Sequence, residues 1–89
     1  NYGGTPLFIS AEKGHVDIFK LLLKYEVDIN RADKFGWTPL IVATQKNQVE
    51  IVKLLIEHGA NVRKMNDHGS TALLVASEIG NIDIVKLLL

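Results

Sequence analysis

The chain has 89 residues, of which 47% are hydrophobic and 22% are charged, a composition typical of one soluble globular domain or of part of a larger one. Ten basic and ten acidic residues cancel, which argues against a binder of nucleic acid or of a membrane surface, since such proteins carry a basic excess. Cysteine is absent, which excludes disulfides and thiolate metal sites, and the longest uncharged stretch, residues 35–45, is too short to span a bilayer. We therefore expect a cytoplasmic or nuclear protein.

The first predicted elements lie in residues 1–32, where a threonine and a proline precede an apolar run. Thr5 is a good helix N-cap, and Pro6 suits the first helical position, because the N–H that proline lacks would have no partner there. A short helix is therefore predicted to begin after Thr5. The apolar run VDIFKLLL, residues 16–23, predicts a second helix.

The same order of elements is predicted in residues 33–65. Thr38 and Pro39 begin a helix that we expect to cover residues 39–46, and a second helix is expected over 49–58. Gly59 is placed to end that helix in a left-handed conformation. The connection that follows is rich in Asn, Asp and Gly and is predicted to be extended with turns.

A third copy, incomplete, occupies residues 66–89, with Thr71 before its first helix and the run IDIVKLLL in its second. Thr5, Thr38 and Thr71 recur at a spacing of 33 residues, and the apolar runs keep the same register. We interpret residues 1–89 as a single array of repeats at 1–32, 33–65 and 66–89.

The second helix of each repeat is apolar on most of its surface. In residues 49–58 only Glu50, Lys53 and Glu57 form a polar stripe. A helix this short is marginal alone, and one this apolar must be buried on more than one side. Stacked copies would bury each helix between its equivalents, so the sequence predicts an all-α repeat solenoid.

The repeats resemble those of the ankyrin family in their 33-residue period and in the motif that begins TPL. The segments that carry the resemblance are GGTPLFISAEKGHVDIFKLLLKYEVDIN, GWTPLIVATQKNQVEIVKLLIEHGANV and GSTALLVASEIGNIDIVKLLL. The resemblance implies stacked antiparallel helix pairs with β-hairpin-like fingers. It also implies a concave surface formed by the fingers and the first helices.

Two departures from the family pattern concern local packing. The histidine that usually follows TPL is replaced by Phe8, Ile41 and Leu74, so apolar packing is expected in place of its hydrogen bonds. Asn47 replaces the inter-helix glycine, and we expect a small cost because asparagine tolerates a left-handed backbone.

No pattern of catalytic, cofactor-binding or metal-ligating residues is evident, so we expect a non-catalytic protein without a cofactor. His15, His58 and His68 fall at different positions of the repeat, and solvated or structural roles are the favoured interpretation. Ser10, Ser70 and Ser77 lack the partners of a catalytic nucleophile.

Residues that packing leaves free to vary lie on the finger tips and on the exposed side of each first helix. On the helices they include Glu12 and Lys13. We predict that a partner protein contacts this surface through Tyr2, Lys34, Phe35, Trp37, Gln45, Lys46, Met65, Asp67, His68, Ser70, Glu78 and Ile79.

Trp37 is the most informative of these residues, because Gly4 and Ser70 stand at its position in the other repeats. An exposed tryptophan would be a typical interface anchor. The alternative is that Trp37 packs on its own finger or on the start of the next repeat, and the two roles can coexist. Asn30 likewise has two interpretations, a hydrogen bond within the fingers or the hydroxylation found in some family members.

The favoured function is a protein–protein interaction module with no nucleic-acid or membrane partner. The alternatives are a structural spacer within a longer ankyrin array and a targeting domain of a larger enzyme. Because Leu87, Leu88 and Leu89 stop inside a second helix, we expect a longer array. End-to-end self-association of the exposed ends is the other possibility.

Overall fold

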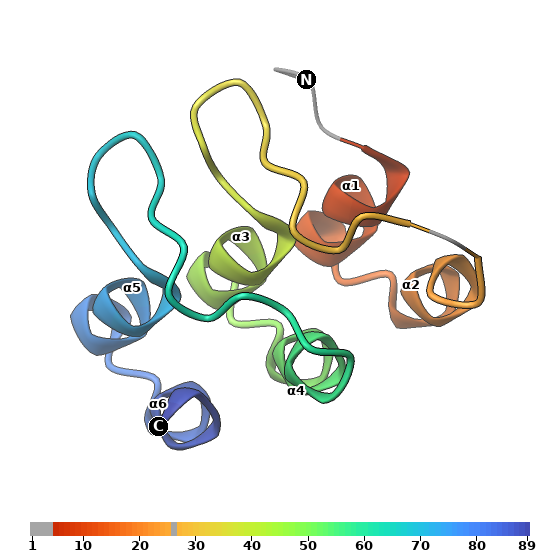
Figure 1. Ribbon diagram of the computed structural model, residues 1–89. Helices are drawn as coiled ribbons and strands as arrows, with labels where there is room; N and C mark the ends of the chain where they lie inside the picture. Colours follow the sequence, from red (N-terminus) through yellow and green to blue (C-terminus); the bar gives the residue numbers. More distant parts are fainter. Residues whose placement is uncertain (1–4, 26) are drawn as a thin grey trace.

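The computed structural model describes residues 5–25 and 27–89, which form six α-helices and no strand (Figure 1). The helices are α1 (Pro6–Lys13), α2 (Val16–Leu22), α3 (Pro39–Gln45), α4 (Val49–Glu57), α5 (Ala72–Ile79) and α6 (Ile82–Leu88). The helices predicted at 39–46 and 49–58 each end one residue earlier than expected. The prediction of an all-helical chain is confirmed.

The helices lie in two rows (Figure 1). In one row α3 packs between α1 and α5, and in the other α4 packs between α2 and α6, while each helix also packs against its partner in the same pair. Phe19, Ile51, Leu55 and Ile84, which lie on the second helices of the pairs, are fully buried. These contacts explain how helices of seven to nine residues are stable, since a helix this short needs tertiary packing.

Threonine caps the first helix of every pair, as predicted. The hydroxyl oxygen of Thr5 accepts the N–H of Phe8 at 3.1 Å, and Thr38 and Thr71 accept the equivalent N–H groups at 3.2 Å. Each hydroxyl satisfies one N–H group that the start of a helix leaves without an intrahelical partner. The cap therefore recurs with the repeat and fixes where each helix begins.

The turn between α3 and α4 confirms the expectation for Asn47, whose φ of 60° is left-handed like that of the glycines it replaces. Its side chain also joins two repeats, because the Asn81 amide donates to the Asn47 Oδ1 at 3.0 Å. Gly59 has a φ of 82° just after α4, so the predicted left-handed helix end is confirmed as well.

The loops that precede α3 and α5 rise beyond the row of α1, α3 and α5 (Figure 1). They occupy the place of the expected hairpin-like fingers, although none of the described residues in them is in a strand. In the first loop the Asp33 N–H donates to the Trp37 carbonyl at 2.9 Å, and in the second the Asn66 N–H donates to the Ser70 carbonyl at 3.0 Å. We call these segments loop 33–37 and loop 66–70.

Neighbouring loops are bonded to each other. The Asp67 N–H donates to the Phe35 carbonyl at 3.0 Å, and the Asn61 N–H donates to the Asn30 Oδ1 at 2.8 Å. The latter bond supports the structural interpretation of Asn30. Loop 33–37 is thus joined to α3 along the chain and bonded to loop 66–70 through Phe35 and Asp67.

The residues in place of the family's histidine show where the stack is covered. Phe8 and Ile41 are buried against the next repeat, as expected, whereas Leu74 is 52% exposed because no described helix follows α5 on that side. The opposite end shows the reverse: Ile18 is 50% exposed, while its equivalents Ile51 and Ile84 are fully buried. Both ends of the described stack therefore expose apolar positions that are buried between repeats.

Candidate functional site

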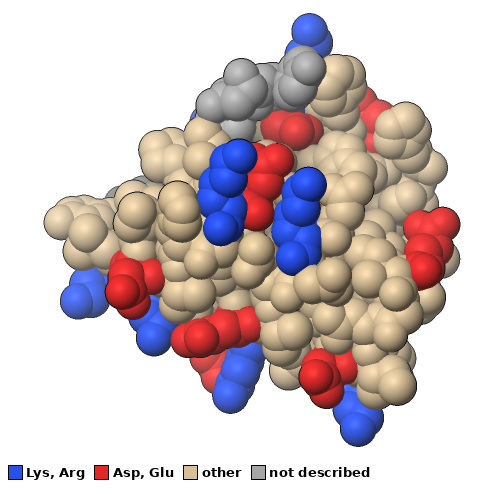
Figure 2. Space-filling model, turned by 180° about the vertical axis from the view of Figure 1, so that it is seen from behind, with Lys and Arg blue, Asp and Glu red and all other residues tan. Residues whose placement is uncertain are grey.

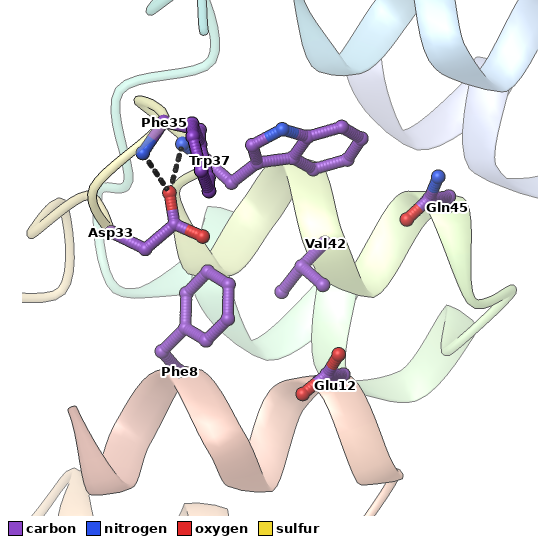
Figure 3. A pocket seen from close by; sticks show the side chains of 7 residues that line it. All are labelled: Phe8, Glu12, Asp33, Phe35, Trp37, Val42 and Gln45. Carbon is purple, nitrogen blue, oxygen red and sulfur yellow. Dashed lines mark hydrogen bonds between the residues drawn. The ribbon is translucent and has the colours of Figure 1, made fainter. Parts of the chain in front are cut away.

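A groove of about 400 Å³ lies between α1, α3 and loop 33–37 (Figure 3). Its walls combine aromatic and aliphatic side chains with two carboxylates and one amide. The lining residues are Phe8, Glu12, Asp33, Phe35, Trp37, Val42 and Gln45.

Asp33 shapes the loop side of the groove. Its Oδ1 accepts the N–H groups of both Phe35 and Trp37, each at 2.9 Å. A short acidic side chain that bonds to the backbone two residues on is a recognised way to form a turn. Here a single carboxylate oxygen holds the two residues whose rings line the groove (Figure 3).

Trp37 is partly buried and packs against the hydrophobic core, and it also lines the groove. Phe35 is more accessible, with 42% of its surface exposed. The Lys34 Nζ lies 6.0 Å from the centroid of the Phe35 ring, a distance at which a cation and an aromatic face attract each other. Trp37 therefore packs against the core and at the same time presents part of its side chain to the groove.

The helix side of the groove is supplied by α1 and α3. Phe8 and Val42 are buried and form its apolar floor. Glu12 and Gln45 project from the two helices toward one end, while Asp33 lies toward the other end beside Phe8 (Figure 3). A ligand in the groove would meet polar groups at both ends and apolar surface between them.

The next repeat shows that packing does not require these side chains. One period further along, Asn66, His68 and Ser70 stand in place of Asp33, Phe35 and Trp37. The Asn66 Oδ1 accepts the N–H groups of His68 and Ser70 at 2.9 and 3.0 Å, so the loop has the same hydrogen bonds. The loop therefore does not need the Phe35 and Trp37 side chains for its hydrogen bonds, in agreement with the comparison of the repeats in the sequence.

The structure brings only part of the predicted surface together. Of the predicted residues, Phe35, Trp37 and Gln45 line the groove. The others lie outside its lining, and Tyr2 is outside the described residues. Lys34, Asp67, His68 and Ser70 are on the two loops, Met65 is exposed just before the second loop, Lys46 follows α3, and Glu78 and Ile79 are the last residues of α5.

Phe8, Asp33 and Val42 were not predicted as site residues, because packing or turn formation was enough to explain them. The repeat period contained a usable signal. Glu12 and Gln45 are 33 residues apart, so they occupy the same position on adjacent first helices. Residues on stacked equivalent helices lie near one another, which could have placed Glu12 in a site with Gln45.

The charges elsewhere are mixed. Figure 2 shows acidic and basic side chains scattered together over the face seen from behind. On the outer surface the Lys20 Nζ lies 3.5 Å from a Glu50 carboxylate oxygen, and exposed pairs of this kind contribute little to stability. This distribution provides no large surface of one charge sign on that face.

Residues 5–25 and 27–89 contain neither a cluster of metal-ligating side chains nor a helix that could span a membrane. Within those ranges no three His, Cys, Asp or Glu side chains form a group suited to a metal ion. Every helix there is too short or too polar to cross a bilayer. Among the histidines, His58 donates from Nδ1 to the Leu54 carbonyl at 2.8 Å, near the end of α4.

Comparison with known families matches residues 7–89 to a family described as ankyrin repeats, in three copies. The match covers α2 to α6 completely and all of α1 except Pro6. None of the curated proteins matches the chain.

Proposed function

Because the chain belongs to the ankyrin-repeat family, whose members are generally protein–protein interaction modules, we propose that it binds a partner protein or peptide in the groove between α1, α3 and loop 33–37. The family is typically non-catalytic, and the proposal assigns no reaction to the chain. The partner is a protein because a short groove flanked by exposed side chains suits an extended peptide segment.

The observation that supports this proposal is the pair of aromatic rings on loop 33–37. Phe35 and Trp37 line the groove, and the equivalent loop of the next repeat forms the same hydrogen bonds with His68 and Ser70 in their place. Aromatic residues are enriched among the side chains that contribute most to protein interfaces. We assign the two rings to partner binding for that reason.

The helix rows support a rigid binding surface. We propose that the three repeats form one segment of an ankyrin solenoid, in which the loops act as fingers along the concave side. The bonds between Asp67 and Phe35 and between Asn61 and Asn30 hold neighbouring loops together before any partner arrives. A preorganised surface loses less conformational entropy on binding.

The test begins with selection of peptides that bind the purified chain from a random displayed library. The affinity of each selected peptide is then measured by titration calorimetry against the wild type and against Phe35→Ala. We expect a loss of about 30-fold or more in affinity, corresponding to the truncation of an interface anchor. Trp37→Ala should have a similar effect on affinity and should also lower the melting temperature, because this ring packs on the core.

Tyr25→Ala is the matched control, since Tyr25 is an aromatic residue that is 68% exposed and lies after α2, outside the groove lining. Its affinity should equal that of the wild type. Selected peptides that bind Phe35→Ala and Trp37→Ala as tightly as the wild type would overturn the proposed site. Selection of no peptide at all would favour the spacer or the targeting domain.

A further inference from the structure

We propose that the groove receives an arginine side chain from an extended segment of the partner, with the guanidinium stacked on the rings of loop 33–37 and paired with Glu12. This inference rests on the proposed function and specifies the chemistry of the partner. Three properties of the groove support it: the sign of its charges, its aromatic walls and the contrast with the next repeat.

Among the described residues that line the groove, the ionisable ones are both acidic, Glu12 and Asp33, and none is a lysine or an arginine. Both are partly buried, so their attraction for a cation is screened less than that of a fully exposed carboxylate. Two backbone N–H groups occupy Oδ1 of Asp33, while Figure 3 shows the second carboxylate oxygen turned toward Phe8 and the groove. A carboxylate has further acceptor sites for a cationic donor.

The aromatic walls favour arginine among cationic side chains. The Lys34 ammonium lies 6.0 Å from the Phe35 ring centroid, a distance at which an aromatic ring attracts a cation. The planar guanidinium stacks on aromatic rings, is less strongly hydrated than ammonium and bonds to carboxylates through paired N–H groups. Lysine has the charge but lacks the planar shape and the paired donors.

The arrangement of acidic and aromatic groups is specific to this position in the stack. At the equivalent positions one repeat later, Gln45 stands for Glu12, Asn66 for Asp33, and His68 and Ser70 for the two rings. That set has neither carboxylate, although the backbone of its loop is bonded in the same way. The fold therefore accepts neutral residues at these positions, and the acidic and aromatic set marks a binding specificity.

The experiment uses the peptides selected on the wild-type chain. We expect an arginine at one constant position in those that are sensitive to Phe35→Ala. Replacing that arginine by citrulline, which keeps the shape and removes the charge, should weaken binding at least tenfold in titration calorimetry. Replacing it by lysine should weaken binding less than citrulline does.

Glu12→Gln tests whether Glu12 is the carboxylate that pairs with the arginine of the peptide. This variant introduces the residue that the next repeat has at the same position, so a change in fold is not expected, and equal melting temperatures would verify this. It should weaken the arginine peptide about tenfold and leave the citrulline peptide unchanged, since a direct pair is coupled in a double-mutant cycle. The control is Glu57→Gln, which removes an exposed carboxylate on α4 and should affect neither peptide.

The possible failures can be told apart. Peptides that depend on Phe35 but have acidic or wholly apolar residues in place of the arginine would overturn this inference and leave the proposed function standing. Equal affinities of the arginine and citrulline peptides would do the same. Peptides that bind without regard to Phe35 and Trp37 would overturn the proposed groove itself, together with the inference that rests on it.

Discussion

At the scale of single residues, Asp33 links the folding of a loop to the geometry of the groove. Both N–H groups bound by its Oδ1 belong to residues whose side chains line the groove. The carboxylate therefore stabilises the loop and directs the rings of Phe35 and Trp37 at the same time. In the next repeat Asn66 has the same bonds, with His68 and Ser70 in place of Phe35 and Trp37.

We predict that Asp33→Ala lowers the free energy of unfolding by about 1–3 kcal/mol, because two N–H groups lose their acceptor. Asp33→Asn should retain most of the stability, since Asn66 accepts the same pair of bonds in the following loop. Urea denaturation measures both changes. Asp28→Ala is the control, because Asp28 accepts one exposed N–H, that of Asn30, and its loss should cost less.

An Asp33→Ala variant as stable as the wild type would show that the loop holds its shape without this acceptor.

The two aromatic residues of loop 33–37 could be predicted from the sequence, because a comparison of repeats showed that the repeat does not require them at their positions. The sequence did not predict that Asp33, Phe8 and Val42 also line the groove. Packing explains Phe8 and Val42, and turn formation explains Asp33. The sequence therefore gave no additional reason to expect that these residues also line a binding site. Their proximity to the rings depends on side-chain directions that only the folded chain defines.

At the scale of elements, the close approach of loop 33–37 to loop 66–70 is set by a glycine. Gly36 has a φ of 81°, and a Cβ built there would lie 2.8 Å from the Asp67 Oδ1 and 2.9 Å from the Asp67 backbone nitrogen. Gly69, its equivalent, has a similar φ of 76° but open space at the Cβ position. The difference between the two positions is the presence of a neighbouring loop.

Gly36→Ala should therefore destabilise the chain more than Gly69→Ala. Both substitutions force a left-handed residue with a side chain, at a cost of about 1–2 kcal/mol. Gly36→Ala should add about 1–3 kcal/mol for the crowding against Asp67. Midpoints of urea unfolding compare the pair, and equal losses would mean that the loops separate without cost.

The helices and their caps could be predicted closely, because N-capping and apolar periodicity depend on residues that are near in sequence. The threonine caps and the left-handed Asn47 are of this kind. The bonds between loops could not be predicted in the same way. The Asn61–Asn30 bond joins positions 31 residues apart, and no local preference specifies which loop atoms meet.

At the scale of the whole molecule, the two ends of the stack present complementary surfaces. Position 41, which is buried against the next repeat, corresponds to the exposed Leu74, and the buried position 51 corresponds to the exposed Ile18. Inside the stack, surfaces of these two kinds pack against each other. The repeat period predicted this packing, but the extent to which the end residues are exposed required the structure.

We predict that the 89-residue chain associates end to end at high concentration, as detected by sedimentation equilibrium. Leu74→Lys and Ile18→Lys should each reduce association, because each places a charge in the apolar contact. An equimolar mixture should recover heterodimers, since each variant retains the end that the other has lost. A wild-type chain that stays monomeric, or a mixture that stays monomeric while the wild type associates, would contradict the prediction.

The groove has walls from two repeats: Phe8 and Glu12 belong to the first and the remaining lining residues to the second. Repeat arrays fray from their ends, because each repeat is held mainly by its neighbours. A partner that contacts both walls would hold the first repeat against the second and oppose local opening of α1 and α2. Amide hydrogen exchange in α1 and α2 should therefore slow when a groove-binding peptide is added. Binding in the groove would then change the exchange rate of residues that do not contact the peptide.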